Sequence, residues 1–270
     1  MSTANKIDPR TTGYAPVNGL NMYYEIYGEG APIVLVHGSF MTIDMNYGKL
    51  IPELARTRKI IAYEIQGHGR TADIDRPFSF PALADDIAGL LAYLEMPKAD
   101  ILGFSLGAAV GLQLAISHPQ VVNKLVFISC TFRTSGWSKE ARDFFLDMKG
   151  DDLDKTPLKP EYDRLAPDKD HWRTFVSKMI LFDNVLYDFG ADKVQTVQSP
   201  VLMIFGDNDG IDLGHVAEMY RLLGGSICGD KDGLPVSQLA ILPGATHSGL
   251  MNQTARLMDL ITPFLDSRRS

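Results

Sequence analysis

A serine between two glycines, at the junction of an apolar run and a helix-like run, is the feature that most constrains the fold. Residues 99–102 are apolar like a short buried strand, residues 103–107 read Gly-Phe-Ser-Leu-Gly, and residues 108–116 are typical of a buried helix. A sharp turn with a strained serine crowds the positions two residues away, where Gly103 and Gly107 carry no side chain. The helix start would point its amides at any anion formed at Ser105. The same pattern can also form a purely structural turn, so the rest of the chain decides.

The charge balance and the apolar runs argue against several classes of protein. Against 26 Lys and Arg there are 33 Asp and Glu, a net charge of −7 with no basic run, so we expect no nucleic-acid partner. The longest apolar runs, at residues 33–36 and 201–205, are too short to cross a membrane, and residues 1–12 are polar, unlike a signal peptide. With only two cysteines, we expect a cytoplasmic protein without membrane contact.

Strand-like and helix-like segments alternate along most of the chain. Asn18-Gly19 between residues 14–17 and 20–27 predicts an antiparallel hairpin. Beyond it we expect strands at residues 32–36, 59–63, 99–102, 122–129, 201–205 and 238–242, and helices at 47–54, 80–94, 108–116, 214–223 and 253–265. This order predicts an α/β fold, with a mostly parallel sheet, an antiparallel N-terminal hairpin and helices on both faces.

Residues 131–198 interrupt the alternation. They are richer in charged, aromatic and Met residues, contain no Val- and Ile-rich run, and have helix-like segments at residues 138–148, 160–165 and 171–181. We therefore predict three parts: the first part of the core at residues 1–130, an α-helical cap at 131–198, and the second part of the core at 199–270.

Two further strand ends carry side chains that would complete a nucleophilic serine. Acyl transfer from a serine needs a base, a group that orients the base, and amides for the oxyanion. Asp207 and Asp209 follow the strand at residues 201–205, and His247 follows the strand at residues 238–242. The carboxyl ends of parallel strands meet at one edge of a sheet, where such folds bind ligands. Either aspartate could instead be a turn residue.

From about Tyr14 to Leu265 the chain resembles the α/β-hydrolase superfamily. Four motifs carry the resemblance: residues 37–40 (His-Gly-Ser-Phe), residues 67–69 (Gly-His-Gly), residues 103–107, and residues 206–209 followed by His247. The resemblance implies that Ser105 is the nucleophile, His247 the base and Asp209 the acid. It places the oxyanion amides at Leu106 and at Ser39 or Phe40, and favours Ser39. One departure is a subfamily mark: relatives often carry Asp and a basic residue at the positions of Glu64 and Gln66.

The remaining histidines have structural interpretations. We expect His68 to pack its loop, His37 to support the oxyanion loop, and His118 to end a helix, whereas His171 and His215 should be solvated on surface helices. No His or Cys cluster has metal-ligand spacing and no glycine-rich loop carries a phosphate-binding lysine, so we expect neither a metal nor a cofactor.

The cap and the oxyanion loop supply large apolar residues for a mostly hydrophobic pocket. The candidate substrate-binding residues are Phe40, Met41, Phe132, Trp137, Phe175 and Met179. No cationic residue stands out as a carboxylate clamp, although Arg70 and Arg133 are candidates.

A serine nucleophile disfavours the haloalkane dehalogenases and epoxide hydrolases that resemble this fold, because they use aspartate. We expect a serine hydrolase of small to medium, mostly hydrophobic esters or lactones, working through an acyl-enzyme as a monomer or homodimer. The alternatives are C–C bond hydrolysis or perhydrolysis on the same triad, or a small-molecule receptor with little turnover. C–C hydrolases of this type usually place an extra Arg and Trp beside the triad, and we match neither here.

Overall fold

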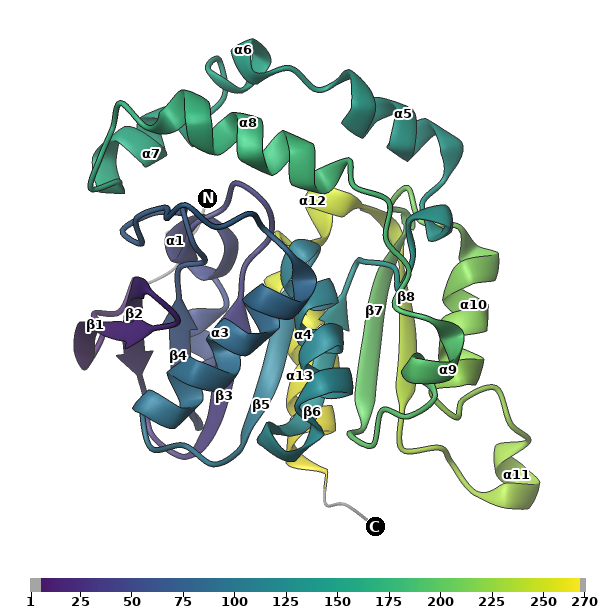
Figure 1. Ribbon diagram of the computed structural model, residues 1–270. Helices are drawn as coiled ribbons and strands as arrows, with labels where there is room; N and C mark the ends of the chain where they lie inside the picture. The colour runs from purple at the N-terminus through teal and green to yellow at the C-terminus, as the bar shows by residue number, and fades with distance from the viewer. Residues whose placement is uncertain (1–5, 268–270) are drawn as a thin grey trace.

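A computed structural model describes residues 6–267 and contains one eight-stranded sheet (Figure 1). The strands are β1 (Thr11–Val17), β2 (Leu20–Tyr27), β3 (Ala31–Val36), β4 (Arg58–Tyr63), β5 (Ala99–Phe104), β6 (Val122–Ile128), β7 (Val201–Asn208) and β8 (Gln238–Thr246). Their order in the sheet is β1-β2-β4-β3-β5-β6-β7-β8. Strand β2 runs antiparallel to both of its neighbours, β1 and β4, and every pair from β4 onward is parallel. The predicted fold class is confirmed.

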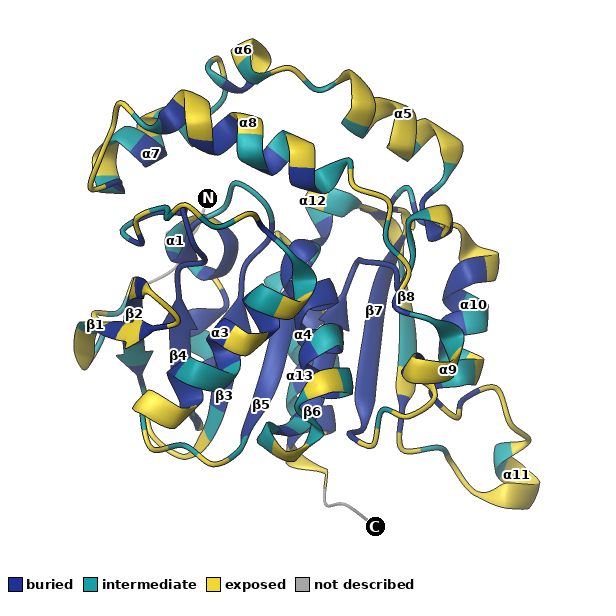
Figure 2. Ribbon diagram, in the orientation of Figure 1, coloured by how far each residue is buried: buried dark blue, intermediate teal, exposed yellow. Residues whose placement is uncertain are grey.

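The central strands are apolar because both faces of the sheet are covered. Every residue of β5 is buried, and Figure 2 shows the central strands as buried along most of their length. One face packs against α3 (Phe80–Tyr93), α4 (Leu106–Ser117), α9 (Ala191–Val194) and α10 (Leu213–Leu222). The other packs against α1 (Ile43–Tyr47), α2 (Ile51–Leu54) and α13 (Thr254–Asp266). The sheet therefore separates two apolar cores.

The turn between β1 and β2 has the backbone that its sequence predicts. Asn18 and Gly19 have φ values of 49° and 83°, and Val17 pairs with Leu20. Positive φ at both central residues gives a turn whose twist matches the flanking strands. The hairpin forms the edge of the sheet and leaves β3 and β5, which lead to the site, in its interior.

Two short helices replace the single helix predicted at residues 47–54. The first, α1, ends at Tyr47, and the second, α2, begins at Ile51. Pro52 has no amide to donate to a preceding turn, so a helix can start beside it but not continue through it.

Four helices between β6 and β7 lie over the carboxyl ends of the parallel strands (Figure 1). They are α5 (Lys139–Asp147), α6 (Gly150–Leu153), α7 (Leu158–Leu165) and α8 (Trp172–Asp183). We call residues 131–198 the cap and keep the boundaries at 130/131 and 198/199 as a prediction. Asp73 of the core ties α8 down, because its carboxylate accepts hydrogen bonds from Lys178 at 2.7 Å and from His171 at 3.0 Å.

The chain enters and leaves the cap along one short antiparallel contact. Arg133 and Asp188 form a β-bridge, the Thr134 amide donates to the Tyr187 carbonyl at 2.8 Å, and the Phe189 amide donates to the Phe132 carbonyl at 2.9 Å. These bonds hold the two ends of the segment side by side.

Two kinds of feature are absent from residues 6–267. None of their helices combines the length and apolar character that crossing a membrane requires. In the same residues, no three His, Cys, Asp or Glu side chains are grouped as metal ligands would be.

Candidate active site

Ser105 lies in a turn that only its flanking glycines allow. Its φ of 53° and ψ of −122° are strained for a side-chain-bearing residue, and α4 begins at the next residue. A Cβ on Gly103 would lie 2.2 Å from the Gly107 carbonyl oxygen, and one on Gly107 would lie 1.9 Å from the Val36 carbonyl oxygen. Both sites therefore exclude any side chain, and the turn presents Ser105 at the carboxyl edge of the sheet.

The three side chains predicted as a triad lie in hydrogen-bond contact. His247, the first residue of α12 (His247–Leu250), places Nε2 3.1 Å from Ser105 Oγ and Nδ1 2.9 Å from Asp209 Oδ1. The Gly206 amide donates to the other Asp209 oxygen at 3.1 Å. The imidazole therefore has a proton acceptor on one nitrogen and a hydroxyl on the other, as general-base catalysis requires.

Asp207, the other candidate for the acid, occupies the turn position that the sequence allows for it. It is exposed, and its Oδ1 accepts hydrogen bonds from the Ala245 amide at 3.2 Å and from Asn208 Nδ2 at 2.8 Å. A hydrogen bond from the Gly244 amide lowers the pKa of this carboxyl. Asp207 thus holds β7 to β8, while Asp209 faces the imidazole.

Ser129 is a site residue that sequence reasoning missed. It follows β6, is fully buried, and has a φ of 59°. Its Oγ lies 2.7 Å from both Asp209 carboxylate oxygens and 2.7 Å from His247 Nδ1. With the Nδ1 proton pointing to Asp209, the Ser129 hydroxyl donates to the same carboxylate. Its place after a parallel strand, at the edge that carries the other side chains, was the signal that could have found it.

Two uncharged histidines hold the oxyanion loop, residues 37–42. His37 accepts a hydrogen bond from the Ile65 amide at Nε2, 3.1 Å, and pairs with the Gly38 carbonyl through Nδ1. His68 accepts from the Phe40 amide at Nε2, 3.2 Å, and pairs with the Gln66 carbonyl through Nδ1. Burial lowers the pKa of His37 to about 3 and that of His68 to about 4, so both are neutral at pH 7.

This arrangement separates the two candidate amides of the loop. The Phe40 amide is committed to His68. Among the residues that the structure describes, the Ser39 amide has no hydrogen-bond acceptor, and Ser39 and Leu106 both line the cavity at Ser105. The geometry therefore favours Ser39 and Leu106 as the pair of free amides.

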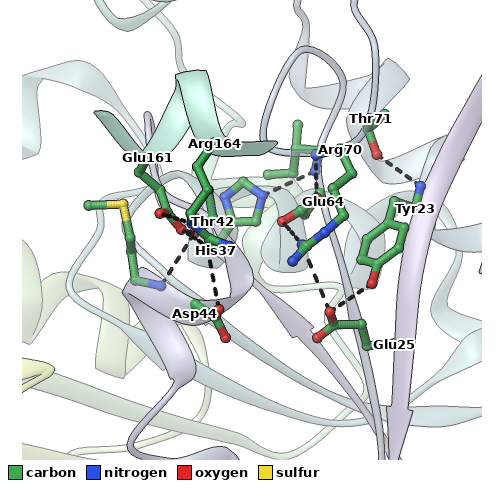
Figure 3. Close-up of polar contacts among 12 residues, drawn as sticks. Tyr23, Glu25, His37, Thr42, Asp44, Glu64, Arg70, Thr71, Glu161 and Arg164 are labelled. Carbon is green, nitrogen blue, oxygen red and sulfur yellow. Dashed lines mark hydrogen bonds and ion pairs between the residues drawn. The ribbon is translucent and has the colours of Figure 1, made fainter. Parts of the chain in front are cut away.

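A buried ion pair fixes the loop that carries His68, as Figure 3 shows. The Glu64 carboxylate accepts from the Arg70 amide at 2.5 Å and from Arg70 Nη1 at 2.8 Å, and Glu25 lies 3.8 Å from the same guanidinium nitrogen. Burial raises the pKa of Glu64 to about 7 although Arg70 opposes this shift. Arg70 is committed here and does not reach the cavity.

The oxyanion loop and the start of α1 are tied to the cap (Figure 3). Thr42 Oγ1 donates to Glu161 of α7 at 3.2 Å, and Arg164 of α7 lies 3.7 Å from the Asp44 carboxylate. Arg133, the second candidate for a carboxylate clamp, pairs instead with Glu218 at 2.6 Å.

A cavity of about 740 Å³ opens above Ser105 between the core and the cap. Of the predicted substrate-binding residues, Phe40, Met41 and Trp137 line it. Four further large side chains between β6 and β7 also line it: Phe145, Met148, Phe182 and Tyr187. Sequence reasoning missed Phe80, Phe104, Asp183 and Leu186. Most of these side chains are apolar, so the cavity suits a hydrophobic ligand.

Three predicted substrate-binding residues lie elsewhere, because they pack between cap and core. Phe132 is fully buried, with its ring 4.7 Å from the ring of His215. Phe175 packs with its ring 4.8 Å from His68 and 5.3 Å from Tyr162, and Met179 is fully buried. These three side chains are not among the residues that line the cavity.

Two histidines expected on solvated surfaces are also placed differently. His215 is buried against Phe132, and burial lowers the pKa of its imidazole. His171 is half-buried, and its Nε2 lies 3.0 Å from the Asp73 carboxylate. Both packed positions follow from the cap lying on the core, which the helical pattern alone does not reveal.

Comparisons with known proteins agree with this fold. The chain is 28% identical over 264 residues to the dihydrolipoyllysine-residue acetyltransferase component of the acetoin cleaving system of Pseudomonas putida, a match that covers 93% of this chain and 68% of that protein. It is 36% identical over 104 residues to the 2-hydroxymuconate semialdehyde hydrolase of Pseudomonas sp. strain CF600, but this match covers only 37% of each chain. The enol-lactonase of Burkholderia xenovorans LB400 shares the fold, with a TM-score of 0.71 and 19% identity over 94% of this chain and 100% of that one.

The family itself follows from the match to a family model. The model of the alpha/beta hydrolase family matches residues 33–260, which include most of β3, the Ser105 turn, Asp209 and His247. The chain therefore belongs to the alpha/beta hydrolase family.

Proposed function

We propose that this protein is a serine hydrolase that cleaves small to medium, mostly hydrophobic carboxylic esters or lactones. The observation that carries the proposal is the continuous contact from Ser105 through His247 to Asp209 at the floor of an apolar cavity. The enol-lactonase that shares the fold supports a lactone or ester as the bond to be cleaved.

The reaction follows from the positions of the atoms. His247 Nε2 accepts the proton of Ser105 Oγ as that oxygen attacks the carbonyl carbon. The amides of Leu106 and Ser39 then stabilise the oxyanion, and the positive end of α4 adds to this effect. The imidazolium, stabilised by Asp209, returns the proton to the leaving alkoxide, and water repeats the sequence to release the acid.

A second candidate reaction is hydrolysis of a C–C bond next to a carbonyl. The 36% identity to a 2-hydroxymuconate semialdehyde hydrolase favours it. Arg70 and Arg133 are each committed to a carboxylate outside the cavity, so neither supplies the arginine that we associate with that reaction. We therefore rank ester and lactone cleavage first.

One screen tests the proposal. Purified protein is assayed on short-chain esters, lactones and a vinylogous diketone. We expect Ser105→Ala to reduce ester turnover by about 10⁵-fold or more, because the nucleophile and its base act as a unit. The control is Ser117→Ala, an exposed serine at the other end of the same helix, which should keep wild-type rates. Turnover of the diketone alone would instead support C–C hydrolysis, and an unchanged rate in Ser105→Ala would overturn the proposed nucleophile.

A further inference from the structure

Asp183 places a carboxyl group in the wall of the cavity, beside the oxyanion loop. It is the last residue of α8, and its Oδ1 accepts a hydrogen bond from Ser39 Oγ at 3.0 Å. The Ser39 amide is one of the two that we assign to the oxyanion. The carboxyl group therefore lies next to the place where the reacting carbonyl would sit.

No nearby cation balances this carboxyl group. Within residues 6–267, Asp183 forms no ion pair, and Ser39 is its hydrogen-bond partner. Asp73, which also lies between core and cap, is the contrasting case. Burial alone would raise the pKa of Asp73, but hydrogen bonds from Lys178, Gln66 and His171 hold it below its usual value. Asp73 is thus fully paired, whereas Asp183 faces the cavity.

Two effects make charge at Asp183 costly. It stands at the carboxyl end of α8, where the helix dipole disfavours an anion. Burial raises the pKa of Asp183 to about 7, against the hydrogen bond from Ser39. The Asp183 carboxyl group therefore becomes negatively charged as the pH rises through neutrality, and at lower pH it is protonated and can donate a hydrogen bond. A position unfavourable for stability is a common mark of a functional group.

The other charged residues of the cavity lie at its solvent-facing mouth on α5. Lys139 and Asp143 pair with each other and are 74% and 52% exposed, and Arg142 is exposed as well. Figure 2 shows much of α5 as exposed. No cation therefore stands opposite Asp183 in the inner wall formed by the described lining residues.

We propose that Asp183 selects substrates by charge: the cavity accepts neutral esters or lactones and rejects those that carry a carboxylate near the reacting carbonyl. This inference rests on the proposed hydrolase function and specifies its substrate class. A substrate carboxylate held beside Asp183 would face a like charge in a poorly solvated wall, without an arginine or lysine to compensate.

Two esters of similar shape test the selection. Ethyl 4-methylpentanoate is neutral, whereas monoethyl succinate ends in a carboxylate, and released ethanol is measured for both. At pH 8.5 we expect wild-type kcat/KM to favour the neutral ester strongly. In Asp183→Asn, the ratio of anionic to neutral kcat/KM should rise by about tenfold or more, as expected when one like charge within a few ångströms is removed. Asn keeps an acceptor for Ser39, so the loop contact is retained.

The pH dependence supplies an independent readout. As pH rises from 6 to 8.5, Asp183 loses its proton, so the wild-type ratio of anionic to neutral turnover should fall, whereas the ratio in Asp183→Asn should stay flat. The other titratable groups that face the cavity are Cys130, Lys139, Arg142, Asp143, Tyr187 and His247. His247 acts on both esters alike. Burial raises the pKa of Cys130 to about 12 and that of Tyr187 well above its usual value, so both stay neutral.

Asp143→Asn is the matched control, because it makes the same change at the exposed mouth. It should alter the ratio less than about twofold, since solvent screens exposed charges. An equal effect of the two variants, or an unchanged ratio in Asp183→Asn with both esters still cleaved, would overturn the inference.

Failure of the proposed function gives a different result. If the wild type cleaves neither ester, binding of 4-phenylbutyramide and 4-phenylbutyrate to the resting protein is compared by calorimetry. Tighter binding of the amide, with the gap narrowed in Asp183→Asn, would support charge selection without catalysis. If the ratio of the affinities for the amide and the carboxylate is the same in the wild type and in Asp183→Asn, the inference is overturned.

Discussion

On one side of Ser105, the imidazole of His247 is held by the carboxylate of Asp209, which also accepts a hydrogen bond from the hydroxyl of Ser129. On the other side, the oxyanion loop is held by His37 and His68, which burial keeps neutral. The two sides do different work. In the proposed reaction, the triad side would stabilise a positive charge that appears on an imidazole, so a fixed anion would be useful there.

The loop side must keep amides pointing at a developing negative charge. Neutral His68 accepts a hydrogen bond from the Phe40 amide, and a protonated ring could not. In the proposed reaction, the same residue type would therefore carry a proton on one side, whereas it is a fixed acceptor on the other. The difference lies in burial, since His247 is partly exposed to the cavity while His37 and His68 are fully enclosed.

The largest expected effect is on the triad side. Replacing Asp209 by Asn should lower kcat by about 10⁴-fold, because the charge and the control of the imidazole tautomer are both lost. Asp207→Asn is the matched control two residues away, and it should cost far less, since Asp207 only holds the strand turn. Steady-state kinetics on a neutral ester compare the two. A larger loss in Asp207→Asn would show that the acid has been assigned to the wrong residue.

The next effect is the pH dependence of stability that the buried histidines of the loop side cause. His37 and His68 have pKa values in the folded protein below the value of about 6.5 in an unfolded chain, so the unfolded state takes up more protons as pH falls. Their contribution to stability is present above about pH 6.5 and is lost toward pH 4, by about 3 kcal/mol for His68. Chemical denaturation of the wild type and of His68→Gln measures this loss.

Gln at position 68 keeps an acceptor for the Phe40 amide but does not titrate. The free energy of unfolding should therefore fall less between pH 6.5 and pH 4 in His68→Gln than in the wild type. Parallel curves for the two proteins would mean that His68 is not held neutral, and the proposed contrast between the two sides would fail.

The smallest effect concerns Ser129. Ser129→Ala removes a hydrogen bond to a charged group, which is worth about 1.5 to 3 kcal/mol, and should reduce kcat by about tenfold or more while shifting the pH profile of kcat/KM. Ser129→Gly removes the same bond but relieves the positive φ, so it should fold more stably than Ser129→Ala. If Ser129 acts only on folding, kcat of both variants will stay at the wild-type value.

Sequence reasoning predicted the features that depend on local pattern. The buried parallel strands appear as continuous apolar runs, and their ends carry Ser105, Asp209 and His247 in a recognisable order. The turn at Ser105 could be inferred because it leaves no room for a side chain at the positions two residues away, which are both glycine. The placement of these residues required only that parallel strands end at one edge.

The missed features depend on how separate segments meet. In α8, apolar residues point toward the core at several positions, so the sequence could not show that Phe175 and Met179 face the core while Asp183 faces the cavity. Ser129 was missed because its one signal, a place at the end of a parallel strand, does not show which side chains it contacts. Its role becomes visible only when β6 and β7 are placed side by side.

Residues 133 and 134 form an antiparallel contact with residues 187 and 188. The chain therefore leaves the core and returns to it at nearly the same place. A segment whose ends already touch can be exchanged for a longer or shorter one with little change in the entropy of closing the chain, because that cost grows only with the logarithm of length. The core would keep Ser105 and His247 whichever segment is inserted. Recombination at this junction is therefore a direct way to give the same core a new pocket.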